Sequence, residues 1–164
     1  MPRYCFEDFI PGTRAGYGSA TLDKDELIAF AREDDPQSFH IDEEAAKASF
    51  VGTLIASGWH TAALHQRLIC DDFIVDSSCL SSPGIDELKW LRPVKPGDTL
   101  TGTREVLSAR VSASKPDRGL VSFAFHLANQ QGEAVMELKN TILFAPRPPG
   151  KAPTPPAPAR ESDS

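Results

Sequence analysis

Asp35 and His40 lie five residues apart in the segment Asp35-Pro36-Gln37-Ser38-Phe39-His40, and these two residue types can activate water together. Because the residue before a proline is displaced from the α-helical region, Pro36 predicts that a helix ends at Asp35 and that a short loop follows. A carboxylate and an imidazole on one short loop can bind the same water molecule and add it to, or remove it from, an activated substrate. An Asp-Pro turn followed by a structural histidine fits the same residues, so the motif alone leaves both interpretations open.

Two helices are expected to position this loop, one on each side of it. Thr21 or Asp23 can cap a helix that runs to about Glu33 and presents an apolar side. After the loop, Asp42 can cap a short helix over 43–48. The loop would then be held between two helix ends.

A further helix is expected from Gly58 to Cys70. Small or apolar residues occupy most of its circumference, which is typical of a buried helix and not of one lying on the surface. Its alanines would let a sheet approach the helix backbone closely. This helix is therefore the best candidate for the centre of the fold.

The second half of the chain has the pattern of an antiparallel sheet. Large apolar residues alternate with smaller or polar ones from Val121 to Ala128, which is the two-residue period of a strand. The expected strands are 85–94, 99–111, the segment from Val121 to Ala128, and the segment from Met136 to Phe144. Short turns rich in glycine and proline join them into a meander. The sequence therefore predicts an α+β fold of two layers, with one buried helix against a long antiparallel sheet.

Composition excludes several classes of function. The chain has 164 residues and a formal net charge of −6, which disfavours nucleic acid as the main partner because a phosphate backbone requires a concentrated basic face. The three cysteines form no CxxC pair, which favours a reducing, cytoplasmic environment. The N-terminus has no signal-peptide pattern, and no apolar run approaches the roughly 18 residues of a membrane span. We expect no interaction with a membrane.

The C-terminal segment changes character abruptly. Of 14 prolines, seven fall between Pro146 and Pro158, separated by small or polar residues. Such a segment has too little apolar surface to offset the entropy of ordering it. We therefore expect a single domain over 1–146 and a disordered, Pro/Ala-rich tail over 147–164.

The other polar residues give weaker signals. His60 and His65 differ by about 500° around a helix at roughly 100° per residue, so they cannot form the i, i+4 pair of a zinc site and are expected to be interior or rim residues. His126 is expected to face solvent. No phosphate-binding glycine loop, dinucleotide motif or metal cluster is present in the sequence, so we expect no metal and no separate cofactor. The cationic residues that could bind phosphate groups are Lys89, Arg92, Lys95 and Arg118.

In the order of these features, the chain resembles the MaoC-like dehydratases, the (R)-specific enoyl-CoA hydratase group of the hot-dog fold. The segment from Asp35 to His40, followed by 41–46, is similar to the hydratase loop of that family and the small helix behind it. Eighteen residues after His40 comes Ser57-Gly58-Trp59, similar to the glycine that opens the family's buried helix. The segment 88–100, with its Pro-Gly-Asp turn, is similar to a strand-turn-strand found throughout hot-dog proteins. The resemblance extends from about Phe6 to Phe144.

The resemblance implies a strongly curved sheet wrapped around the central helix, and a homodimer or dimer of dimers with acyl-CoA at the interface of two folds. It implies that Asp35 and His40 bind the catalytic water and that the backbone N–H of Gly58 donates to the thioester oxygen. The reaction would be reversible hydration of a trans-2-enoyl-CoA to the (R)-3-hydroxyacyl-CoA.

Further residues are expected to contact the substrate: Ser57, Trp59, Gln66, Arg92 and Lys95. Some family members place a serine on the buried helix near the catalytic aspartate, and Gln66 could hydrogen-bond Asp35 in its place. Two other functions stay open: a hot-dog thioesterase, in which a carboxylate directs water to the thioester carbonyl, and a non-catalytic hot-dog subunit that binds acyl chains or a partner enzyme.

Overall fold

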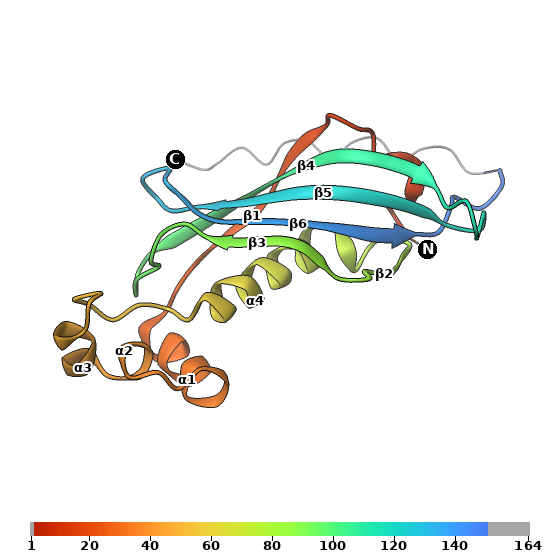
Figure 1. Cartoon of the computed structure of the whole chain (residues 1–164). Helices are drawn as coiled ribbons and strands as arrows, with labels where there is room; N and C mark the ends of the chain where they lie inside the picture. The colour runs from red at the N-terminus through yellow and green to blue at the C-terminus, as the bar shows by residue number, and fades with distance from the viewer. Residues whose placement is uncertain (1, 151–164) are drawn as a thin grey trace.

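The computed structural model describes residues 2–150, and its centre is an antiparallel sheet. The strand order is β1-β4-β5-β6-β2, and β3 also pairs with β6 (Figure 1). The strands are β1 (Arg14–Thr21), β2 (Cys79–Ser81), β3 (Ile85–Trp90), β4 (Thr99–Val111), β5 (Gly119–Ala128) and β6 (Ala134–Phe144). Three of the four strands of the expected meander pair in succession as β4-β5-β6, whereas β3 pairs with β6 and not with β4. β1 extends the sheet beyond β4.

One long helix lies under this sheet, and three shorter helices gather beyond its end (Figure 1). The helices are α1 (Lys24–Asp34), α2 (Ser38–Ile41), α3 (Glu43–Ala48) and α4 (Gly58–Ile69), with single turns η1 (Phe6–Asp8) and η2 (Cys70–Ile74), the latter a π-helix. The α+β arrangement of a curved sheet around a central helix is the one expected from the sequence. None of the helices within residues 2–150 has the length and apolar content needed to cross a membrane.

The core forms where α4 meets β5. The large side chains of β5 that point toward the helix are fully buried, as its alternating pattern predicted. From α4 the buried residues are Thr61, His65, Leu68 and Ile69, which lie on one side of the helix. The alanines Ala62 and Ala63 lie outside this buried set, so only part of the circumference of α4 is covered.

Side-chain caps begin the helices at the expected places. The carboxylate of Asp23 accepts hydrogen bonds from the N–H groups of Asp25 and Glu26, and that of Asp42 accepts from Ala45. Asp35 is the C-cap of α1, so the helix ends where the proline predicted. The segment after it differs from the expected loop, because residues Ser38–Ile41 form one helical turn that carries His40.

The folded part of the chain continues past the expected boundary at residue 146. The backbone N–H of Arg147 donates to the carboxylate of Glu7 at 2.9 Å, and its guanidinium pairs with the partly buried carboxylate of Asp8. Arg147 therefore contacts η1, one residue past the expected boundary. The rest of that prediction concerns mainly 151–164, which lie outside the described residues.

Candidate active site

Asp35 and His40 face each other across the junction of α1 and α2. The Oδ2 of Asp35 lies 3.5 Å from Nε2 of His40. The His40 side chain is 6% exposed and that of Asp35 is 18% exposed, so the pair is largely shielded while the carboxylate keeps some access to solvent. The two residues singled out in the sequence are thus within reach of one water molecule.

The hydrogen bond on the far side of the His40 ring fixes which nitrogen is basic. Its Nδ1 lies 2.8 Å from the carbonyl oxygen of Ile55. Because a carbonyl oxygen can only accept, Nδ1 carries the hydrogen, and in the neutral ring the lone pair is on Nε2. That lone pair is on the side of the ring that faces Asp35.

Two donors hold the Asp35 carboxylate. The hydroxyl of Ser57 donates to Oδ2 at 2.6 Å, and the amide of Gln37 donates to Oδ1 at 2.8 Å. These bonds, with Ser57 first, and the nearby His40 lower the pKa of Asp35 below its usual value, because they stabilise the charged form. Asp35 is therefore an ionised carboxylate at neutral pH.

Gly58 is the first residue of α4, and its N–H has no acceptor within the helix. Ser57 is the N-cap, and its hydroxyl oxygen accepts from the N–H of Trp59 at 3.2 Å. The positive end of the helix dipole therefore lies at Gly58. A free N–H in this field is a suitable donor to an oxygen that gains negative charge.

The ring of Trp90 packs against Gly58 and leaves no room for a side chain at this position. The indole N–H of Trp90 donates to the carbonyl oxygen of Gly58 at 2.9 Å, and a Cβ on Gly58 would lie 2.5 Å from the Trp90 ring. Trp90 also packs edge-to-face against Trp59, with ring centroids 5.3 Å apart. Glycine is therefore needed at this position to leave room for the indole ring.

A pocket of about 500 Å³ opens beside these groups. His40 and Gly58 line it together with Trp90 and mainly apolar residues, which include Val94 and Val135. Arg92 lies at the pocket, where its guanidinium donates to the carbonyl of Ala134 at 3.0 Å. His40 and the first residue of α4 therefore line the same cavity.

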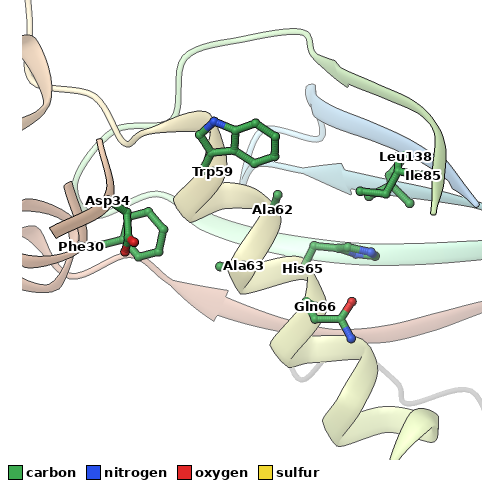
Figure 2. Close-up of a pocket in the computed structure, with 9 residues that line it drawn as sticks. All are labelled: Phe30, Asp34, Trp59, Ala62, Ala63, His65, Gln66, Ile85 and Leu138. Carbon is green, nitrogen blue, oxygen red and sulfur yellow. The ribbon is translucent and has the colours of Figure 1, made fainter. Parts of the chain in front are cut away.

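A second, open groove of about 590 Å³ runs along the other side of α4 (Figure 2). Trp59, His65 and Gln66 line it from the helix, and Ile85 and Leu138 from the sheet. Of the residues expected from the sequence, His40, Gly58 and Arg92 line the first pocket, and Trp59 and Gln66 line this groove. Asp35, Ser57 and Lys95 line neither.

Two expected contacts are corrected by the structure. The partner of Asp35 is Ser57, at the N-cap of α4; the Gln66 amide instead donates to the sulfur of Cys70 at 3.4 Å. Ser57 has no exposed surface, so it cannot contact a substrate directly. The sequence did contain a signal for its actual position, because a serine directly before a helix is a preferred N-cap.

The other three histidines lie outside the Asp35–His40 pair, and their contacts are with structural residues or with solvent. His65 is buried, its Nδ1 lies 3.0 Å from the hydroxyl of Tyr17, and burial lowers its pKa to about 4. His60 stacks on Phe30, and burial lowers its pKa also. The side chain of His126 is 43% exposed, as expected. Within residues 2–150 no three His, Cys, Asp or Glu side chains are arranged to hold a metal ion.

Comparison with known proteins gives one family. The model of the MaoC like domain matches residues 10–121. A crystal structure of the MaoC-like dehydratase from Rhodospirillum rubrum is 38% identical, with a TM-score of 0.81 over 88% of this chain and 98% of that one. The R-hydratase PhaJ1 from Pseudomonas aeruginosa is 25% identical, with a TM-score of 0.70 over 89% of this chain and 88% of that one. These matches confirm the hot-dog fold expected from the sequence.

A curated relative matches with similar coverage. The uncharacterized protein YdeM from Bacillus subtilis is 28% identical over 126 residues, which are 77% of this chain and 88% of that protein.

Proposed function

The chain belongs to the family of MaoC-like domains, and on this premise we propose that it reversibly hydrates a trans-2-enoyl-CoA to the (R)-3-hydroxyacyl-CoA. The observation that carries the proposal is the pairing of Asp35 Oδ2 and His40 Nε2 at 3.5 Å beside a pocket that also contains the start of α4. Two acceptors at this separation can each receive one hydrogen of the same water. A carboxylate and a neutral imidazole are the required acceptors.

In the hydration direction, the water oxygen bonds to the β-carbon while His40 Nε2 takes one of its protons. The electron pair of the carbon–carbon double bond moves into the thioester, which becomes an enolate. The Asp35–His40 pair then delivers a proton to the α-carbon, so one water is added and the pair returns to its initial state. The ionised Asp35 holds the water and stabilises the imidazolium that forms.

The N–H of Gly58 donates to the thioester oxygen as it becomes an enolate. It lies at the first position of α4, where the helix dipole also favours negative charge. Loss of one such donor typically costs about 100-fold in rate. The donor is a backbone group, so its position depends on the whole start of the helix.

The pocket next to His40 supports a thioester substrate by its composition. Its mainly apolar lining suits an acyl or pantetheine chain, and Arg92 is the cation among the residues that line it. We assign phosphate binding to Arg92 with Lys95, which lies nearby in the Pro-Gly-Asp turn. Because CoA is part of the substrate, the reaction needs no other cofactor. The cytoplasmic location predicted from the cysteines accords with such a substrate, and all three thiols are free.

The active unit is proposed to be a homodimer or a dimer of dimers, with the substrate between two copies. Within residues 2–150, β3 pairs on one side only, and the groove along α4 lies open next to it. Both features fit a second copy.

The proposal is tested with a panel of enoyl-CoAs, by following loss of enoyl absorbance and release of free thiol in parallel. Hydration removes the absorbance without thiol release, whereas a thioesterase releases thiol. Asp35→Asn and His40→Ala should each lower kcat by about 100-fold, because both act on one water, and the double variant should be little worse than the worse single. His126→Ala is the matched control and should leave kcat unchanged. Binding without turnover by the wild type, on every substrate, would identify a non-catalytic subunit.

A further inference from the structure

Ser57 makes two hydrogen bonds through one hydroxyl group, and they join separate parts of the site. The Oγ–H donates to Asp35 Oδ2 at 2.6 Å, and the same oxygen accepts from the N–H of Trp59 at 3.2 Å. The direction is fixed, because an ionised carboxylate can only accept. One hydroxyl therefore connects the C-cap of α1 to the first turn of α4.

The backbone of Ser57 is held as firmly as its side chain. Its carbonyl oxygen accepts from the N–H of Thr61 at 3.1 Å and from the Thr61 hydroxyl at 3.4 Å. The residue has no exposed surface. Because the hydroxyl cannot turn toward solvent and its single hydrogen is already donated, its position defines the position of the carboxylate oxygen bonded to it.

That carboxylate oxygen is the one that faces the base. Oδ2 of Asp35 lies 2.6 Å from Ser57 Oγ and 3.5 Å from His40 Nε2. The next residue along the chain, Gly58, carries the free N–H at the start of α4. Ser57 therefore lies between the group that holds the water and the group that would receive the thioester oxygen.

We propose that Ser57 is a positioning residue, which fixes the Asp35 carboxylate relative to the Gly58 N–H so that water and thioester meet in one geometry. This inference rests on the proposed function. It replaces the substrate contact expected for Ser57 with an action through Asp35. Such a role matters because displacements of about 1 Å within a reacting pair can cost 100-fold in rate.

Loss of the hydroxyl should change the chemical step more than substrate binding. Without it, Asp35 keeps only the bond from the exposed Gln37 amide, and its carboxylate can rotate away from His40. We expect kcat to fall by about 10-fold or more, the range for a hydrogen bond to a charged group, with KM changed by less than about 3-fold. The pKa of Asp35 should rise, since the hydrogen bond from Ser57 is the largest cause of its low value and the bond from Gln37 is the next.

The test must separate this role from simple helix capping. Ser57→Gly removes the hydroxyl but keeps most of the N-cap preference, whereas Ser57→Ala removes both, and Ser57→Thr restores the hydroxyl. Asp23→Ala, at the N-cap of α1, is the control that loses a cap without touching the carboxylate. Crotonyl-CoA hydration, Tm, and the Asp35 pKa from carbon-detected NMR titration are measured for all variants.

The proposal requires that Ser57→Gly and Ser57→Ala lose kcat alike and raise the Asp35 pKa, although Ser57→Gly has the smaller loss of Tm. Ser57→Thr should recover kcat, and Asp23→Ala should lower Tm with kcat unchanged. Loss of kcat that simply follows Tm across all four variants, or an unchanged Asp35 pKa in Ser57→Gly, would overturn it. Failure of the wild type to hydrate any enoyl-CoA would contradict the proposed function instead, while the NMR titration would still decide whether Ser57 controls the carboxylate.

Discussion

At the scale of single residues, the site combines a local motif with contacts that cross the fold. Asp35 and His40 could be found from the sequence because a proline and a spacing of five residues place them together. The bond from Ser57 to Asp35 spans 22 residues, and that from Trp90 to Gly58 spans 32. No local pattern specifies such contacts, so the hydrogen bonds that hold the proposed catalytic groups could be identified only from the fold.

The contact between Gly58 and Trp90 gives a prediction for stability. In Gly58→Ala the new methyl group would lie 2.5 Å from the indole ring, well inside van der Waals contact, so Trp90 must move and lose its bond to the Gly58 carbonyl. We expect a loss of about 1–3 kcal/mol in the free energy of unfolding, as for an overpacked site. Urea unfolding of Gly58→Ala, Trp90→Leu and the double variant measures the coupling. If the new methyl group clashes with the indole, Gly58→Ala should lower the free energy of unfolding clearly less in the Trp90→Leu background. An equal loss in both backgrounds would show that the clash is with another group.

At the scale of elements, helices and strands with a regular hydrophobic pattern could be predicted from the sequence. Elements that form only because they pair or pack with another part of the chain could not. The alternation in β5 and the small-residue surface of α4 gave the two central elements. β1 was not predicted, because its sequence contains two glycines and buries only Tyr17, whose ring lies where a Cβ on Gly102 of β4 would be. Pairing with β4 orders this strand. The single turn of α2 was missed because a helix of four residues carries almost no periodic signal.

Tyr17 and His65 join β1 to α4 through a buried hydrogen bond, and the burial of the His65 ring should make stability depend on pH. Burial lowers the pKa of His65 to about 4, whereas an unfolded histidine has a pKa of about 6.5. The unfolded state therefore binds a proton first, so the stabilisation is complete above pH 6.5 and is lost as the pH falls to about 4. The loss from His65 should be about 3 kcal/mol.

Urea unfolding at several pH values between 7 and 4 measures this effect. His60 changes stability in the same direction, so the comparison needs a variant that removes the His65 ring and keeps His60. Tyr17→Phe with His65→Leu removes both partners of the bond and should flatten the pH dependence, whereas Tyr17→Phe alone keeps the titrating ring. Because the pKa of Asp35 is lowered, its own effect on stability appears only as the pH falls below the usual pKa of an aspartate, which is outside most of the range from pH 7 to 4. An unchanged slope in the double variant would show that His65 is protonated alike in both states.

At the scale of the whole molecule, the surface around the groove is more apolar than is usual for an isolated chain. The helices α1 to α3 lie beyond the end of the sheet (Figure 1). Within residues 2–150 the buried side chains of α4 lie on one side of the helix. Large apolar side chains are exposed around the groove and the neighbouring pocket: Trp59 and Ile85 at 55% and 53%, and Phe50, Trp90 and Leu91. Exposed apolar surface next to an open strand edge is typical of an interface.

A second copy of the chain accounts for these features together, because it would cover the groove and pair with β3. Ile85 is at the start of β3 and also lines the groove, so Ile85→Glu should place a charge in the interface and convert the dimer to a monomer. Leu107→Glu, at an exposed apolar residue of β4, is the control and should leave the assembly unchanged.

Sedimentation velocity gives the mass of each variant, and enoyl-CoA hydration is measured over a dilution series. If the substrate lies between two copies, the activity per chain of the wild type falls as the dimer dissociates, and Ile85→Glu starts at the low value with its Tm little changed. A wild-type monomer whose activity per chain does not depend on concentration would exclude the shared site and require that one fold holds the whole thioester.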